Sequence, residues 1–541
     1  SILLWMKQKG HSSCALTASF KGMVYNCSFI GNILSRSLLY PLYTKPEKIA
    51  KRLSSCKILS FKIKNCLVVI PCVSSYYDIK NRISNRKQKD VIYLIFSSIE
   101  FLLWFLPVFL IVYGITPSKY RNLTLLVGSI VFYAMGDAGN LAPLMISVLC
   151  NYFIGLHLAK RSPKTLWRKR LLFVTALSIN IGILIWIKCR GGSAGLPLGI
   201  SFYTFQILSY LIDVYRGDAD REYSFLKFAT YVVMFPKLIS GPITRYGEVK
   251  YSLYNRTFTM QGLEDGMKLF ILGLAAKVLV ADRVGILWHE VQVTGFESIS
   301  TPLAWLAAIA YSMEIYFDFW GYSLMAMGLG RMLGFELPVN FRRPYMARSV
   351  RDFYRRWHMT LGQWFCRYVY IPLGGSRQGE LRTIFNLFAV WILTAFWHGT
   401  GWNFFCWGGL LWICIVMERQ LQRLKLVHKM KVLPHIYLWL IIPISWMCFA
   451  ITDLSQLEVY LNKMLWLVPG ISGGYEDARK ALSTYGGLLA VSGLVCTPVI
   501  EKLYNYGKDK ILMKILLAAV FWYCVWRLIL EGNNPFMYFS F

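Results

Sequence analysis

Long apolar runs occupy most of the sequence after Val91, and they constrain its fold more than any other feature. A transmembrane helix needs about 20 apolar residues to cross the bilayer core, or fewer where neighbouring protein shields its ends. The runs of this kind are 92–115, 121–136, 141–158, 171–189, 196–214, 303–330, 384–397, 403–418, 433–451, 486–499 and 512–529. The pattern predicts an all-α polytopic integral membrane protein with about eleven transmembrane helices.

Two further apolar stretches, 225–240 and 265–285, are interrupted. They predict re-entrant, interfacial or spanning helices. Pro107, Pro236 and Pro242 lie inside or beside apolar runs. Broken backbone is tolerated at membrane depth where it faces protein rather than lipid, and we expect that arrangement here.

The positive charge of the chain is concentrated between the apolar runs. The sequence has 59 Lys and Arg against 28 Asp and Glu, a net charge of +31. Loops rich in Lys and Arg remain in the cytoplasm, so we place 159–170, 419–431 and 500–511 on that side. The last span then puts the C-terminus outside the cell. We therefore predict a multi-pass protein of the plasma or inner membrane, whose positive charge serves the bilayer and not nucleic acid.

Residues 1–90 differ from the remainder of the chain. They carry 16 Lys and Arg against three Asp and Glu, with no spanning run and no signal-peptide pattern. Three spans before a cytoplasmic loop 159–170 would place the basic stretch 80–89 outside, against the rule for basic loops. Either an early span is miscounted, or residues 1–90 lie upstream of the functional start. We predict a basic extension, 1–90, and a membrane domain, 91–541.

A histidine at the end of an apolar run is the first candidate for chemistry. His398 ends one predicted span and precedes another across a Gly-rich turn. An ionisable side chain inside a membrane is costly and indicates a functional site by default. Apolar surroundings should keep the ring neutral, and a neutral imidazole can act as a general base. The alternative is a histidine that only ties two helices together. The neighbours expected to support this site are Trp397, Gly399, Trp402 and Asn403.

The second candidate, His358, follows a strongly basic amphipathic segment. Arg355, Arg356 and Trp357 directly precede it. Such a segment can lie on the membrane surface against acidic headgroups. It can equally hold the phosphates of a ligand, because Arg presents a planar fork of donors. We expect nearby cations to lower the pKa of His358.

The predicted topology separates the two histidines in depth. The run 403–418 must end in the cytoplasm, so 384–397 begins there and His398 lies toward the outer side. His358 lies nearer the cytoplasm. This arrangement suits a reaction whose donor and acceptor arrive from opposite sides of the membrane.

Motifs of other enzyme classes give no competing site. The sequence contains no P-loop and no HExxH zinc helix, and its Gly-x-Ser-x-Gly match at 191–195 is a Gly-rich stretch that we interpret as a loop between two apolar runs. Its 13 Cys form no CxxC pair and no metal-like spacing. We expect no metal site and no bound cofactor.

Seven short segments occur in order along the chain. They are FSSIEF (96–101), LPLGISFYTFQ (196–206), FPKLISGPI (235–243), RRWH (355–358), YIPLGG (370–375), WHG (397–399) and NPFMYF (534–539). As an ordered set they resemble the membrane-bound O-acyltransferase (MBOAT) family, specifically its bacterial alginate O-acetylase branch. Relatives commonly have Ser and a second acid where this chain has Trp320 and Leu324, and any polar role at those two positions is in doubt.

The resemblance implies tilted helices around a funnel, with a narrow tunnel through the membrane. It implies that His398 matches the family's catalytic histidine and that His358 matches its second histidine. It further implies transfer of an acyl group, usually acetyl from acetyl-CoA, to hydroxyls of an extracytoplasmic polymer. A separate exported SGNH-type partner often completes the transfer in this branch.

We therefore predict an acyltransferase that moves an acetyl group from a cytoplasmic thioester to an extracytoplasmic cell-envelope polysaccharide. Acetyl-CoA or another acyl thioester is the expected co-substrate. His398 is the expected base, and His358 would orient or polarise the thioester, with Arg355, Arg356 and Trp357 at the donor entrance. Two alternatives remain open: a D-alanyl transfer protein for teichoic acids, and a transporter of a polymer or substrate.

Overall fold

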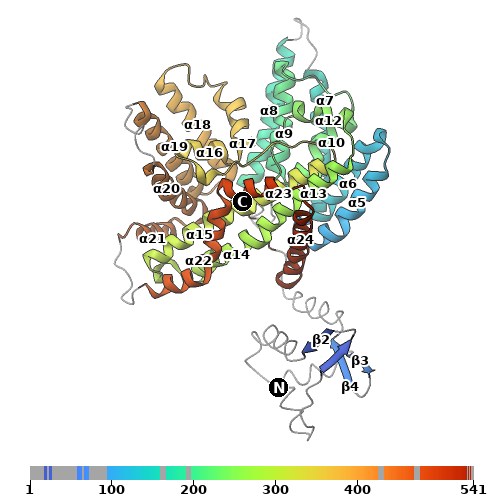
Figure 1. The fold of residues 1–541 in the computed structure, drawn as a ribbon. Helices are drawn as coiled ribbons and strands as arrows, with labels where there is room; N and C mark the ends of the chain where they lie inside the picture. The colour runs from blue at the N-terminus through green and yellow to red at the C-terminus, as the bar shows by residue number, and fades with distance from the viewer. Residues whose placement is uncertain are drawn as a thin grey trace. The chain divides into compact units, whose positions relative to one another are not determined.

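The chain divides into two units, Ser1–Val91 and Ile92–Phe541, which are described separately (Figure 1). The computed structural model describes four strands of the first unit. In the second unit it describes 94–158, 166–190, 196–423, 432–467 and 475–532, together with Asn534 and Met537.

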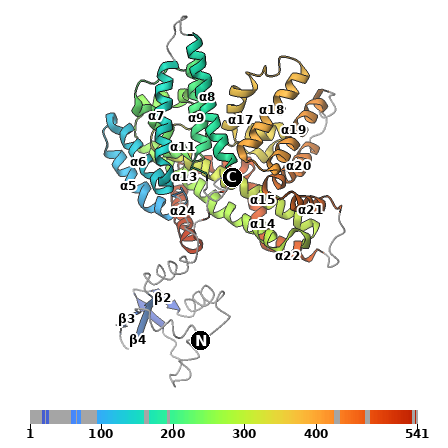
Figure 2. The same cartoon turned by 180° about the vertical axis from the view of Figure 1, so that it is seen from behind.

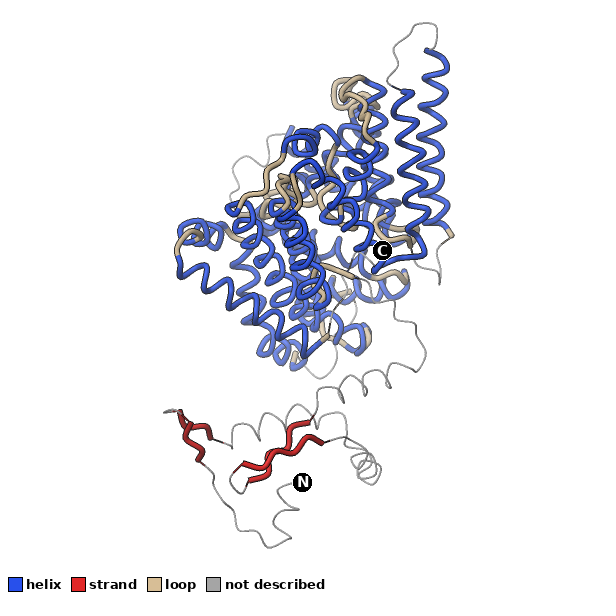
Figure 3. The backbone as a smooth tube through the Cα atoms, turned by 90° about the vertical axis from the view of Figure 1, so that its right-hand side faces the viewer, coloured by secondary structure: helices blue, strands red, loops and turns tan. Residues whose placement is uncertain are grey.

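The first unit contains two antiparallel hairpins (Figure 3). Strand β1 (Thr17–Phe20) pairs with β2 (Met23–Asn26), and β3 (Ile58–Ile63) pairs with β4 (Cys66–Pro71). The predicted all-α architecture did not include these strands. The sequences of β3 and β4, ILSFKI and CLVVIP, are rich in β-branched and apolar residues, which favour strands.

The described part of the second unit is helical, and in its first half the long helices α6–α9 are followed by the short helices α10–α12. The π-helix η1 (Phe101–Phe105) leads into α5, and the 3₁₀ turns η2 (Ser118–Tyr120) and η3 (Ala138–Asn140) flank α6. The α-helices are α5 (Leu106–Ile115), α6 (Arg121–Asp137), α7 (Leu141–Leu158), α8 (Leu166–Cys189), α9 (Ile200–Arg216), α10 (Phe225–Val233), α11 (Phe235–Leu238) and α12 (Tyr246–Asn255).

The second half starts with a long broken helix: α13 (Met260–Ala275), the π-helix η5 (Ala276–Ala281) and α14 (Asp282–Thr294). The short elements η6 (Phe296–Ser298), η7 (Pro344–Met346) and η8 (Cys366–Tyr370) connect later helices. The remaining α-helices are α15 (Thr301–Met332), α16 (Val350–Arg356), α17 (Met359–Phe365), α18 (Glu380–His398), α19 (Trp402–Arg423), α20 (Leu433–Ala450), α21 (Leu454–Met464), α22 (Glu476–Val495), α23 (Pro498–Gly507) and α24 (Ile511–Glu531).

Two groups of helices, α7–α9 and α18–α20, lie on opposite sides of the second unit in both views (Figures 1 and 2). Helices α13 and α15 cross at paired glycines. A β-carbon on Gly273 would lie 2.4 Å from the carbonyl oxygen of Gly321, and one on Gly266 would lie 2.5 Å from that of Gly328. The two backbones are therefore in direct contact, as small residues allow between membrane helices.

A buried ion cluster follows this crossing. The Lys277 ammonium lies 2.7 Å from a carboxylate oxygen of Asp282 and 2.7 Å from one of Asp318. The backbone N–H of Met537 donates to Asp318, and the side chain of Asn534 donates to Asp282. The C-terminal segment thus closes on the cluster that joins η5 and α14 to α15.

The described residues supply six helical stretches that are long and apolar enough to span a membrane, or seven if the bent pair α22 and α23 counts as one. The predicted count of about eleven is not confirmed. The runs 196–214 and 303–330 form α9 and α15, whose side chains are mostly buried. In α8 and α24, by contrast, only 22% of the spanning window is buried. Hydropathy alone does not distinguish helices buried in protein from helices that face lipid.

The α13–α15 crossing yields the first prediction. Gly273→Ala places a methyl group on the Gly321 carbonyl, and overpacking of this kind costs about 1–3 kcal/mol. We expect a lower unfolding temperature for the purified protein in detergent. Gly487→Ala in α22 is the matched control, because its new methyl meets no atom within 4 Å and Ala is the better helix former. Equal unfolding temperatures for the two variants would contradict the close crossing.

Candidate functional site

A short helix pair, α16 and α17, brings the RRWH segment into the protein. The Ser349 hydroxyl caps α16 by accepting from the N–H of Asp352 at 2.9 Å. The Glu418 carboxylate of α19 accepts from the N–H groups of Val350 and Arg351 at 2.6 and 3.1 Å. Both contacts satisfy amide donors that a helix start leaves free, and they fix α16 against α19.

His358 occupies the turn between these helices in a left-handed conformation, with φ of 43°. Residues with a β-carbon rarely adopt this region, and such strain clusters at functional sites. The side chain is 3% exposed and packs edge-on against Phe319. Burial lowers the pKa of His358 to about 3, so the ring is neutral near pH 7. The pKa of His358 is therefore lowered, as predicted, but the cause is burial and not the neighbouring arginines.

His398 is the last residue of α18 and is 6% exposed. Its ring is surrounded edge-to-face by those of Trp397, Trp407 and Phe449, with centroids 4.7–5.1 Å away. Lys188 of α8 is buried and donates its ammonium proton to the Trp397 carbonyl at the C-terminal end of α18. A cation at this end of a helix opposes its partial negative charge.

One small cavity brings the two histidines together. Its volume is about 120 Å³, and His358 and His398 both line it with Tyr354, Trp357 and Trp446. No carboxylate lies among its lining residues. Two imidazole rings thus share a largely aromatic chamber, where acid–base chemistry on a hydroxyl group is possible.

A larger basic cavity lies next to this chamber. Its volume is about 410 Å³, and Arg351, Arg355 and Arg419 line it. Tyr354 and Gly362 border both cavities. The wider cavity is thus basic, and the narrow one is lined by uncharged groups. Together they suit a ligand that has an anionic head and an uncharged reactive end.

The predicted entrance residues separate in the structure. Arg355 lines the basic cavity, and Trp357 lines the small one. Arg356 lines neither cavity, because its side chain pairs with Asp352 one turn earlier at 3.0 Å.

The four predicted supporting residues also have different places. Trp397 packs against both histidines, and the Asn403 amide donates to the carbonyl of Phe449, which itself packs on His398. Gly399 gives room to the Phe404 ring, since a β-carbon there would lie 2.1 Å from it. Trp402 is 74% exposed and packs on Phe405, away from both cavities.

Sequence reasoning missed three polar residues of this region: Lys188, Asn340 and Arg419. Lys188 carried a usable signal, because it is an ionisable residue inside an apolar run. Asn340 lies 18 residues before His358 in the sequence and forms a hydrogen bond with it. The local sequence around Asn340 does not predict that contact.

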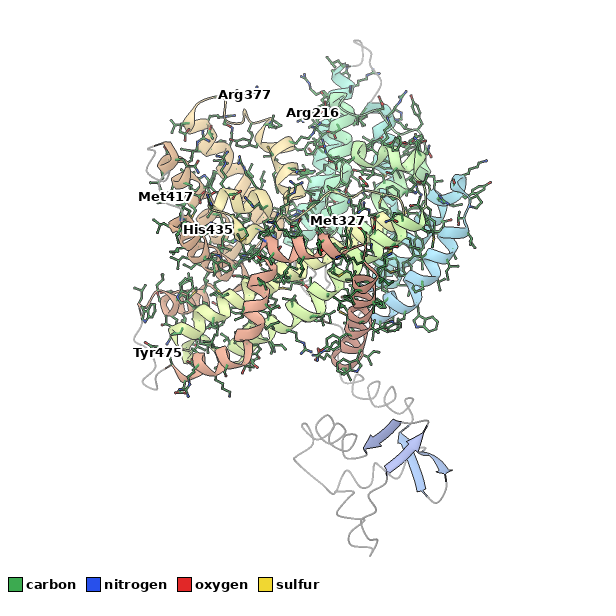
Figure 4. The ribbon with its side chains drawn as sticks, viewed as in Figure 1. Arg216, Met327, Arg377, Met417, His435 and Tyr475 are labelled. Carbon is green, nitrogen blue, oxygen red and sulfur yellow. The ribbon has the colours of Figure 1, made fainter. Side chains whose placement is uncertain are left out.

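Arg216, at the end of α9, and Arg377, just before α18, lie at the same end of the second unit (Figure 4). Arg419, near the C-terminal end of α19, pairs with Glu380 at the start of α18 at 2.9 Å. The start of α18 and the end of α19 were both predicted to face the cytoplasm, and the structure places the end of α9 on the same side (Figure 4).

Comparison with known proteins identifies relatives of this architecture. The sequence profile of the membrane-bound O-acyltransferase family matches residues 125–452. A probable alginate O-acetylase of Pseudomonas putida is 31% identical over 490 residues, covering 83% of this chain and all of that protein. A peptidoglycan O-acetyltransferase of Helicobacter pylori is 30% identical over 510 residues, covering 83% of this chain and 92% of that protein. A teichoic acid D-alanyltransferase of Streptococcus thermophilus is 27% identical over 250 residues, covering 43% of this chain and 59% of that protein.

Proposed function

The chain belongs to the membrane-bound O-acyltransferase family, and from that premise we propose that it transfers acetyl groups from acetyl-CoA to hydroxyls of a cell-envelope polysaccharide. The donor binds on the cytoplasmic side, and the acceptor is extracytoplasmic. Residues 91–541 carry the reaction in this proposal, and the family profile matches residues 125–452 within them.

The observation that carries this proposal is the adjacency of the two cavities. Arg351 and Arg355 offer planar donor forks to the phosphates of coenzyme A, whereas Arg419, which also lines this cavity, pairs with Glu380. The thioester end carries no charge, so it can pass Tyr354 and Gly362 into the chamber of His358 and His398. Holding donor and acceptor in one small chamber supplies the proximity that group transfer requires.

The chemistry follows from the neutral histidines. The acceptor hydroxyl attacks the thioester carbonyl while His398 takes its proton, because a hydroxyl is a poor nucleophile until that proton is removed. The C–O bond forms, the C–S bond breaks, and the thiolate leaves with the electron pair and regains the proton. His358, on the Arg355 side of the chamber, orients the thioester.

Orientation and partners complete the proposal. We place the enzyme in the inner membrane with its C-terminus outside, as the basic loops suggest. Shared placement of Arg216 and Arg377 at one end of the helical unit supports a common cytoplasmic side (Figure 4). An exported SGNH-type acetyltransferase is the proposed partner that receives or passes on the acetyl group.

Coverage by relatives favours O-acetylation over D-alanylation. The two O-acetyl-transferring relatives each align with 83% of this chain, whereas the D-alanyltransferase aligns with 43%. A D-alanyltransferase would draw its acyl group from a carrier protein, and a free coenzyme A thioester would not serve it.

The deciding experiment is mass analysis of envelope glycans from a strain that lacks this gene. We expect loss of O-acetyl groups from one polysaccharide and their return when the gene is restored. Unchanged O-acetylation of every glycan would contradict the proposal. Loss of D-alanine esters instead would favour the alternative transfer.

The basic cavity yields a prediction about the donor. Arg355→Gln should raise the KM for acetyl-CoA roughly tenfold with little change in kcat, since a hydrogen bond to a charged group contributes about 1.5–3 kcal/mol. Arg356→Gln is the matched control: it removes an equal charge from the same helix, but that charge pairs with Asp352. Similar KM values for acetyl-CoA in both variants would contradict donor binding by Arg355 and would favour the alternative that α16 is a membrane anchor.

His398 yields a second prediction. General-base assistance contributes about 10²–10⁴-fold, so His398→Ala should lose at least that factor in transfer while remaining inserted. His398→Gln keeps hydrogen-bonding capacity but cannot take a proton at neutral pH, and it should fail equally. Transfer assays on purified protein, with membrane level as the folding control, decide the matter. Near-normal transfer by the Gln variant would rule out the base.

A further inference from the structure

Asn340 connects the helix α15 to the turn that carries His358. It lies between α15 and α16 and is 1% exposed. Its backbone carbonyl accepts from the N–H of Met359 at 2.9 Å. Two residues later, the N–H of Arg342 donates to the carbonyl of Arg356 at 2.9 Å. These two backbone bonds fasten both sides of the strained His358 turn to the Asn340 segment.

The hydrogen bonds of Asn340 settle which end of its amide faces His358. The N–H of Thr360 lies 3.3 Å from Oδ1, and a backbone N–H can only donate. The Thr360 hydroxyl is 3.0 Å from the same oxygen, while Nδ2 donates to the Ser323 hydroxyl at 3.1 Å. The atom that faces the Thr360 amide is therefore the carbonyl oxygen.

The tautomer of His358 follows from that assignment. Its Nδ1 lies 3.1 Å from the Asn340 oxygen, so Nδ1 carries the proton. In a neutral ring the second nitrogen is then a bare acceptor. This Nε2 is buried and makes no hydrogen bond with any residue that the structure describes.

Building on the acyl transfer proposed above, we propose that Asn340 is a positioning residue that holds His358 as the Nδ1–H tautomer, and that Nε2 accepts a hydrogen bond from an amide N–H of the donor's phosphopantetheine arm. His358 thereby orients the thioester. It does not polarise the carbonyl, because a neutral ring with bare Nε2 has no proton to donate there.

The surroundings of His358 favour a neutral acceptor. The titratable groups that share its cavity are Tyr354 of α16 and His398 of α18, and no carboxylate lines the cavity. Helix α15 presents the ring of Phe319 to it. The nearby cation of α8, Lys188, is held by the Trp397 carbonyl. A pantetheine arm has amide N–H groups close to its thioester. The phosphates of the same donor would lie in the neighbouring basic cavity.

The test is Asn340→Asp in the full chain, assayed with acetyl-CoA and alginate oligosaccharides as the acceptor probe. The carboxylate preserves the acceptor for Nδ1–H but favours the imidazolium, which raises the pKa of His358. A doubly protonated ring cannot accept. We expect the KM for acetyl-CoA to rise roughly tenfold between pH 9 and pH 6 in this variant, relative to the same ratio in the natural protein.

Ser323→Ala is the matched control, because it alters the same network on the side away from His358. It should not introduce a pH-dependent KM. If His358 polarises the carbonyl by donation, the protonated ring would do so better, and kcat of the Asp variant would rise toward pH 6. That result, or a KM ratio equal to that of the natural protein, overturns the inference.

A second measurement needs no variant of Asn340. The natural protein should use the S-acetyl thioester of N-acetylcysteamine at least severalfold better than S-butyl thioacetate, which lacks the amide N–H. Equal use of both donors overturns the inference while leaving acyl transfer in place. Absence of transfer from any thioester contradicts the proposed function itself, so the two failures are distinguishable.

Discussion

The contact between the backbones of α13 and α15 is the constraint on which the site depends. Gly273 and Gly321 meet without side chains between them, and most side chains of α15 are buried inside the helical unit. From there α15 presents Phe319 to the ring of His358 and the Ser323 hydroxyl to Asn340. A bulkier residue at the crossing would displace the helix that locates the strained His358 turn.

The proposed function assigns donor binding and reaction to two cavities with different dielectric surroundings. In that proposal, hydrogen bonds from the guanidinium groups of Arg351 and Arg355 compensate the water that the donor's phosphates lose in the wide cavity. The chamber beside them is small and aromatic, and a charged ligand group would be costly there. Only the uncharged end of a donor fits both environments. The neutral state of His358 has the same origin, because burial disfavours its cation.

The sequence predicts the family better than it predicts the geometry of the site. Its ordered motifs identify the family, and the structure adds that His358 and His398 line one chamber, while their catalytic roles stay predictions. The number of spans was harder to predict from the sequence. The reason is that α9 is as apolar as a lipid-facing helix but is buried in the protein. The local sequence also predicted the same role, at the donor entrance, for Arg355 and Arg356. Only the structure shows that Asp352 engages one and leaves the other at the cavity.

The strained backbone of His358 and the hydrogen bonds around it both hold its imidazole ring in one orientation. A left-handed residue with a β-carbon is maintained only where its surroundings leave no easier conformation. Asn340 supplies that constraint through its backbone, which bonds the turn, and through its amide, which fixes the ring. A mobile imidazole in an aromatic chamber could present either nitrogen to a ligand. Fixing the tautomer removes that ambiguity, so the ring that we propose to orient the thioester has its orientation and protonation state set in advance.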